Sequence, residues 1–133
     1  MFRNFVYLFI IFDSVFCWKP EIVPFPSVFN VELRDSYELI CSLVKGSKPI
    51  QFEWFKNGLK FVSESGITID PKPYSSRLTF DQFNFDSAGN YSCRASNSDG
   101  FDQSTISLQI KGLFIFQYIL DRCVALQIVK IFF

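Results

Sequence analysis

The sequence predicts an all-β protein, a sandwich of two antiparallel sheets. Between Glu21 and Lys111, apolar residues recur at every second position in short runs, a pattern typical of strands with one buried face. Turn-forming residues separate these runs about every ten positions, which leaves room for about eight short strands. Short strands separated by turns at this spacing favour two packed sheets around one core.

A third observation is the order of a few residues along the chain. Cys41 is followed 13 residues later by Trp54, and Cys93 follows Trp54 by 39 residues. The segment that ends at Cys93 is Asp86-Ser87-Ala88-Gly89-Asn90-Tyr91-Ser92-Cys93, with the pattern Asp-x-Ala-Gly-x-Tyr-x-Cys. This order resembles the immunoglobulin superfamily. The resemblance implies one disulfide, Cys41 to Cys93, that joins the two sheets.

The implied bond suits a two-sheet sandwich. An inward cysteine on each sheet holds the sheets face to face, and closing a loop of 52 residues contributes roughly 4 kcal/mol in the chain-entropy model. The indole of Trp54 would fill the space beside the sulfurs. Tyr91 is placed for a tyrosine corner, with its hydroxyl bonded to backbone near Asp86. Gly89 marks the turn from corner into strand, where a side chain is often unwelcome.

The first elements follow from prolines and from alternation. Pro20, Pro24 and Pro26 exclude helix and central-strand pairing, so we expect a first edge strand that breaks and changes sheet. Two strands with alternate inward positions come next. Their inward residues are Phe29, Val31 and Leu33, then Tyr37, Leu39, Cys41 and Leu43.

The later elements follow the same alternation. Residues 46–49 form a turn, the pair Asn57-Gly58 predicts a tight hairpin, and residues 97–100 turn the chain before the last strand. A short strand is expected around Ile67 and Ile69. The inward residues of the other strands are Ile50, Phe52 and Trp54; Leu78 and Phe80; Tyr91, Cys93 and Ala95; and Ile106, Leu108 and Ile110.

The N-terminal residues 1–17 differ from the middle of the chain. They contain one basic residue, Arg3, then the apolar run 5–12 and a less apolar region that ends at Cys17. This is the pattern of a secretory signal peptide cleaved after Cys17. A retained first strand or a signal anchor is the alternative. Secretion would supply the oxidising compartment that the disulfide requires.

Residues 113–133 form a hydrophobic C-terminal tail. The tail is long enough to span a bilayer, but a charge near its centre, where Asp121 and Arg122 lie, costs about 2.5 to 3.5 kcal/mol. Three interpretations stay open: a poor transmembrane anchor, a nonhomologous end left by a truncated or mispredicted transcript, and an amphipathic or sticky terminal helix. Cys123 has no partner once Cys17 is removed, so we expect a free or intermolecular thiol.

Composition excludes several classes of function. The chain has no histidine, which excludes triads and zinc sites that depend on imidazole. Basic and acidic residues both number 13 and form no basic stripe, which argues against nucleic acid as a partner. The carboxylates that an enzyme would need fall in turns and corners, where they cap amides: Asp70, Asp81, Asp86, Asp99 and Asp102. We therefore predict no enzyme, metal or cofactor.

A narrower resemblance suggests a function. The cysteine spacing resembles the intermediate (I-set) type of domain, and five segments resemble the variable immunoglobulin domains of the arthropod Down syndrome cell adhesion molecule (Dscam) family. These segments are 24–26, 48–58, 76–78, 89–97 and 111–112. In that family such domains bind copies of themselves on apposing cells, which implies homophilic adhesion. The family pattern continues into further domains, a membrane span and a cytoplasmic tail, whereas this sequence continues into the apolar tail.

Recognition must use side chains that face water. Exposed apolar residues are the candidate interface, Phe55 on one sheet and Ile40 with Val44 on the other, with ordinary surface scatter as the alternative. The outward positions are Gln51, Glu53 and Phe55; Asn90, Ser92, Arg94 and Ser96; Glu38, Ile40, Ser42 and Val44; and Arg77, Thr79 and Asp81.

The remaining site predictions are structural or concern modification. Arg77 and Asp86 are expected to form an ion pair. Asn90-Tyr91-Ser92 is an N-glycosylation sequon in a strand beside the bridge, where access is poor, and a glycan there would block that face. The predicted structural core contains Trp54, Leu78, Asp86, Gly89 and Tyr91.

We therefore predict one I-set domain over residues 18–112 that acts by protein–protein binding. Its expected partner is another copy of itself, in homophilic adhesion on neural or immune cell surfaces. Its expected location is secreted or on the extracellular side of the plasma membrane, with membrane contact only if residues 113–133 anchor it. The alternatives are a secreted soluble ligand or decoy and a truncated fragment of a larger adhesion receptor.

Overall fold

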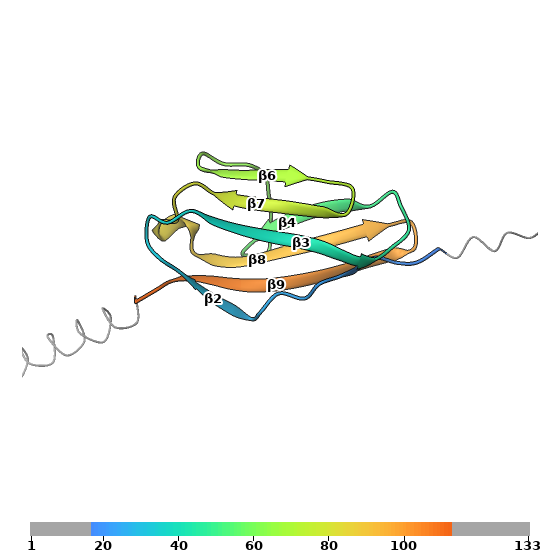
Figure 1. Cartoon of the computed structure of the whole chain (residues 1–133), viewed down its shortest axis with the longest axis horizontal. Coiled ribbons are helices and arrows are strands. Elements are labelled where there is room, and N and C mark those ends of the chain that lie inside the picture. The colour runs from blue at the N-terminus through green and yellow to red at the C-terminus, as the bar shows by residue number, and fades with distance from the viewer. Residues whose placement is uncertain (1–16, 113–133) are drawn as a thin grey trace, which may run out of the picture.

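The computed structural model describes residues 17–112, which fold into two β-sheets (Figure 1). One sheet contains, in spatial order, β1 (Glu21–Ile22), β3 (Tyr37–Lys45), β7 (Ser75–Phe80) and β6 (Ile67–Pro71). The other contains β2 (Val28–Val31), β9 (Gly100–Ile110), β8 (Gly89–Asn97), β4 (Gln51–Lys56) and β5 (Leu59–Phe61). The predicted all-β sandwich is confirmed. The predicted tail, Cys123 and all of the predicted signal peptide except Cys17 lie outside the described residues.

The start of the domain changes sheet, as the prolines predict. β1 pairs antiparallel with β3 in the first sheet, whereas β2 pairs parallel with β9 in the second. Two side chains of β9 bind the backbone where the chain leaves β1 and crosses toward β2. The amide N–H of Ile22 donates to Asp102 (2.9 Å) and that of Phe25 donates to Ser104 Oγ (2.8 Å). The crossing segment therefore ties both sheets together at one edge.

The core lies between the sheets around the disulfide. Cys41 on β3 and Cys93 on β8 are joined, with an S–S distance of 2.07 Å, which confirms the implied pairing. Trp54 on β4 is buried beside Cys93, and its indole N–H donates across the sandwich to Ser76 Oγ on β7 (2.9 Å). Most of the predicted inward residues are buried: Leu39, Leu78, Phe80, Tyr91, Ala95, Ile106, Leu108 and Ile110.

The predicted Asn57-Gly58 hairpin and Gly89 lie close together at one end of the molecule. Asn57 and Gly58 have positive φ angles of 51° and 80°, and they connect β4 to β5. The Asn57 side chain accepts a hydrogen bond from the Asn90 amide (2.9 Å). A Cβ on Gly89, whose φ is 151°, would lie 2.9 Å from the same Asn57 oxygen. Gly89 is thus required by close approach as well as by its backbone angle.

The corner before β8 is a short 3-10 helix, η1 (Phe85–Ser87), capped by Asn84. The Tyr91 hydroxyl donates to the carbonyl of Ser87 (2.7 Å), one residue beyond the position expected at Asp86. Tyr91 is fully buried, and burial, with a smaller contribution from the charge of Glu64, raises the pKa of its hydroxyl well above the usual range. The predicted tyrosine corner is confirmed.

Two predictions about charged residues are wrong. Arg77 pairs with Glu38 (3.3 Å) on the neighbouring strand β3 and not with Asp86. Asp86 is exposed on η1 and does not belong to the core, although its carbonyl oxygen accepts a hydrogen bond from Lys56 Nζ (2.6 Å). The strand register explains the difference, because it sets Arg77 on β7 between Ile40 on β3 and Asp70 on β6.

One predicted strand face is only partly inward. In β2, Val31 is buried, but Phe29 is exposed, and Leu33 after the strand is exposed as well. Phe29 lies at the sheet edge, where its ring stacks on Tyr37 with centroids 5.1 Å apart. An edge strand of four residues has too little sheet around it to cover every inward position.

The strand pairs, the hydrophobic core and the disulfide of this sandwich all lie within residues 17–112. Every strand pairs within this range, the core cluster closes within it, and both halves of the disulfide belong to it. We therefore expect residues 18–112 to fold as one unit, and these domain bounds stay a prediction. No helix in the described part of the chain has the length and apolar character required to cross a membrane.

Candidate protein-binding faces

The outer face of the five-stranded sheet is built mainly from β4, β8 and β9. These three strands are hydrogen-bonded neighbours, so their outward residues stand side by side in rows. Three rows cross the middle of the face: Phe55, Ser92 and Thr105; Glu53, Arg94 and Gln103; and Gln51, Ser96 and Phe101.

Arg94 lies at the centre of this face between two aromatic rings. Its guanidinium carbon is 5.3 Å from the Phe55 ring centroid and 4.6 Å from that of Phe101. Its Nε donates to Gln103 (3.1 Å). We call Phe55, Arg94 and Phe101 the Arg94 cluster. Phe101 is 54% exposed, whereas Phe55 is half-buried, so the predicted apolar residue is the less exposed of the two rings.

The carboxylate beside the cluster, that of Glu53, pairs with a lysine and not with Arg94. Glu53 is the cross-strand partner of Arg94, yet its Oε1 pairs with Lys60 Nζ on β5 (2.6 Å). Among residues 17–112, no acceptor reaches the terminal Nη atoms of Arg94. Ser92, expected to face water, is largely covered, and its hydroxyl hydrogen-bonds to that of Thr105 (2.8 Å).

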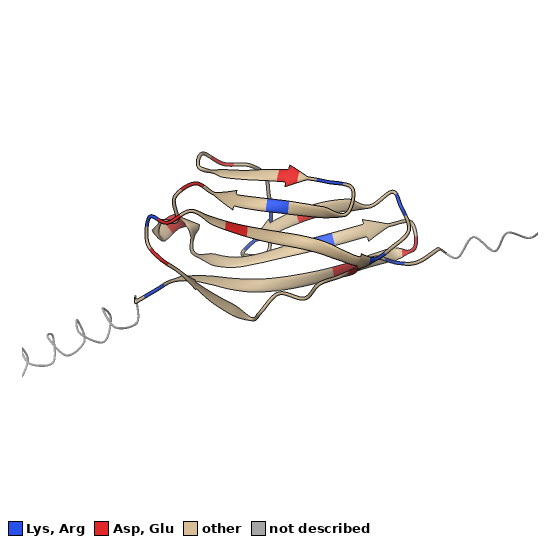
Figure 2. Cartoon of the chain, in the orientation of Figure 1, with Lys and Arg blue, Asp and Glu red and all other residues tan. Residues whose placement is uncertain are grey.

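The outer face of the four-stranded sheet carries the other predicted apolar residues. Ile40 and Val44 on β3 are 45% and 59% exposed, in line with their predicted outward positions. The charged residues around them already have partners within the chain, since Arg77 pairs with Glu38 and Lys72 with Asp70. Figure 2 shows acidic and basic positions interspersed over the described strands and loops, with neither sign dominating the face in view.

The sequon lies at one end of the β4–β8–β9 face. The Asn90 side chain is exposed, while the other two sequon residues, Tyr91 and Ser92, are buried. The backbone carbonyl of Asn90 accepts from the Asn57 amide (2.8 Å). The asparagine is therefore open to solvent in the folded domain, in contrast with the poor access expected, and its glycosylation stays a prediction.

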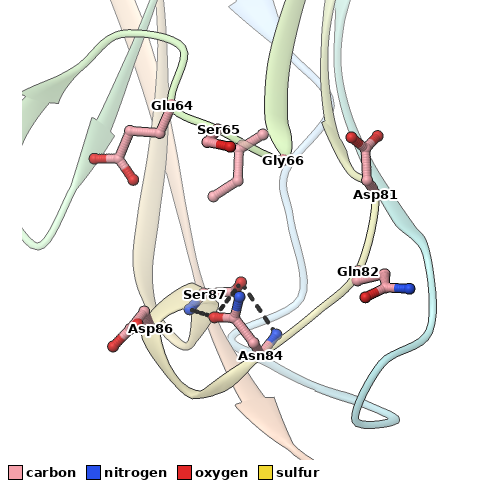
Figure 3. Close-up of a pocket in the computed structure, with 9 residues that line it drawn as sticks. Glu64, Ser65, Gly66, Asp81, Gln82, Asn84, Asp86 and Ser87 are labelled. Carbon is pink, nitrogen blue, oxygen red and sulfur yellow. Dashed lines mark hydrogen bonds between the residues drawn. The ribbon is translucent and has the colours of Figure 1, made fainter.

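A hollow of about 450 Å³ lies beside the corner, bordered by acidic residues (Figure 3). Figure 3 shows Glu64 and Asp86 on one side and Asp81 on the other, with their carboxylates spread apart. Asn84 and Ser87 at its base hydrogen-bond to each other. Within residues 17–112 no group of three potential metal ligands comes together. The carboxylates that border the hollow therefore do not converge on one point.

Sequence reasoning missed Phe101 as an interface candidate. The signal was available, because Ile106, Leu108 and Ile110 are the inward residues of the last strand. Odd-numbered positions of that strand therefore face outward, and Phe101 is the one large apolar residue among them within β9. The position of Arg94 between two rings depends on strand pairing, which parity alone does not supply.

Comparisons with known proteins identify the family. The Immunoglobulin I-set domain model matches residues 20–110. The crystal structure of the Dscam1 Ig7 domain, isoform 5, is similar with a TM-score of 0.64 and 30% identity, over 70% of this chain and 97% of that domain.

Curated relatives share shorter parts of their length. Mouse cell adhesion molecule DSCAML1 is 38% identical over 58 residues, which are 44% of this chain and 3% of DSCAML1. Rat junctional adhesion molecule A is 35% identical over 92 residues, which cover 62% of this chain and 29% of that protein. This chain thus spans less than a third of either relative. The matched family is generally non-enzymatic, and several of its members are cell adhesion molecules. The chain belongs to the immunoglobulin I-set domain family.

Proposed function

We propose that this domain mediates recognition at cell surfaces by binding a second copy of itself. Homology to the immunoglobulin domains of cell adhesion molecules supports a role in recognition. The observation that carries the proposal is the Arg94 cluster, a partly exposed group of two aromatic rings and an arginine on a sheet face. Aromatic residues and arginine are the types most enriched where protein interfaces hold their binding energy.

The proposed location is extracellular, either secreted or on the outer side of the plasma membrane. The Cys41–Cys93 disulfide supports this location, because such bonds form and persist in oxidising compartments. The names of relatives such as mouse vascular endothelial growth factor receptor 1 also fit a cell-surface setting.

Self-association of purified 18–112 tests the proposal. We expect sedimentation velocity to show a dimer whose population rises with protein concentration. Phe55→Asp alters the β4–β8–β9 face and Ile40→Asp alters the opposite face, so loss of the dimer in one variant identifies the face in use. A wild-type domain that stays monomeric up to high concentration would refute homophilic binding and point to a different protein as partner.

A further inference from the structure

We propose that two copies of the domain join through their β4–β8–β9 faces about a two-fold axis parallel to the strands. In this arrangement Arg94 of each copy binds Glu53 of the other. The inference rests on the proposed homophilic function and deepens it, because it specifies the face, the contact residues and the relative direction of the two copies.

Arg94 is held in place while the donors on its terminal Nη atoms stay unused within residues 17–112. The rings of Phe55 and Phe101 and the amide of Gln103 fix its position. Arg94 forms no ion pair with a carboxylate of residues 17–112. A guanidinium presents its terminal N–H groups as a planar fork that matches a carboxylate. The Arg94 cluster therefore lacks a carboxylate, which a partner would supply.

The chain offers such a carboxylate on the same face. Lys60 bonds to Oε1 of Glu53, and no atom of residues 17–112 bonds to Oε2. The Glu53 side chain is also partly exposed, at 32%. Lys60 thus holds the carboxylate in position and leaves one oxygen for a second copy.

The relative positions of Glu53 and Arg94 on the sheet determine how two copies can meet. Glu53 and Arg94 are cross-strand partners on β4 and β8, which lie about 4.8 Å apart. A two-fold axis that runs along the strands, midway between β4 and β8, places β8 of one copy over β4 of the other. Arg94 then lies opposite Glu53 of the second copy, and the same contact repeats by symmetry.

The alternative axis gives the opposite result. An axis perpendicular to the strands and level with this row places Arg94 opposite Arg94 and Glu53 opposite Glu53. Facing like charges are unfavourable, so the charge pattern favours the parallel arrangement. On the opposite sheet face, by contrast, Arg77 and Lys72 are already paired with Glu38 and Asp70.

The test mixes two charge-reversed variants of 18–112. We expect Arg94→Glu and Glu53→Arg each to weaken the dimer by about 100-fold or more, because each homodimer would contain two like-charge contacts. In an equimolar mixture, the introduced glutamate of the first variant meets the introduced arginine of the second. The two native residues meet at the symmetry-related position, so both contacts become attractive. Sedimentation velocity should therefore show two monomeric variants that form a heterodimer when they are combined.

Ile40→Asp, on the opposite face, is the matched control and should dimerise like the wild type. A wild-type dimer that persists in Arg94→Glu, or that Ile40→Asp abolishes, would overturn the inference and leave homophilic binding intact. Two folded variants that stay monomeric when mixed would also overturn the pairing. A monomeric wild type would refute both proposals. Circular dichroism and a thiol assay on each variant confirm that the domain is folded and its disulfide closed.

Discussion

Tyr91 shows how one residue stabilises the corner of this domain. Its hydroxyl donates to the Ser87 carbonyl, and its ring packs edge-on against Phe61 and Phe80. Tyr91→Phe keeps the ring and leaves that carbonyl without its donor. We expect a loss of about 1–3 kcal/mol in the free energy of unfolding, measured by urea titration. A variant as stable as the wild type would show that water replaces the hydroxyl at no cost.

The same residue predicts a pH dependence. Because burial raises the pKa of Tyr91 in the folded state, the folded domain holds this proton more tightly than the unfolded chain does. The stabilisation is fully present below the usual tyrosine pKa of about 10 and is lost as pH rises above it. We expect wild type to lose more stability than Tyr91→Phe between about pH 9 and 11. Parallel pH profiles would contradict this assignment.

For single residues, the sequence was enough to predict contacts that depend on local chain geometry or on the two-sheet sandwich. Tyr91 lies two residues before Cys93 and four after Ser87, so its corner forms within one short segment. The partner of Arg77 depends instead on how β3 aligns with β7. Sequence alone does not give that register, and the predicted pair with Asp86 was therefore wrong.

Among the elements, the crossing between β1 and β2 depends on β9. The amide of Ile22 is held by Asp102, and that of Phe25 by Ser104. Asp102→Ala removes the acceptor of the Ile22 amide. We expect hydrogen exchange at Ile22 to accelerate at least about tenfold while the amides of β8 remain protected, because local opening needs only the crossing to detach. Asp81→Ala, at the other end of the sandwich, is the control and should leave Ile22 unchanged.

The elements also show where sequence reasoning stops. Three prolines between positions 20 and 26 were enough to predict a strand that breaks and changes sheet. They did not show that β2 would be a short edge strand, so Phe29 was expected inside and lies exposed. The Arg94 cluster needs residues from three strands, and only the assembled sheet places them together.

For the whole molecule, a glycan on Asn90 would oppose the proposed dimer. Asn90 is exposed on β8, the strand that carries Arg94, and four residues along a strand span about 13 Å. We expect protein made in a glycosylating host to self-associate more weakly than Asn90→Gln from the same host. Enzymatic removal of the glycan should abolish the difference. Equal association of a fully glycosylated wild type would place the interface elsewhere.

The parallel pairing of β2 with β9 has a mechanical consequence. The two ends of the described segment leave the sandwich at opposite ends of its long axis (Figure 1). A pulling force on those ends draws β2 and β9 past each other along their length, over the four residue pairs from Val28 with Ser107 to Val31 with Ile110. Hydrogen bonds across such a pair must fail together and not one after another. The domain would therefore resist unfolding by a force that pulls its two ends apart.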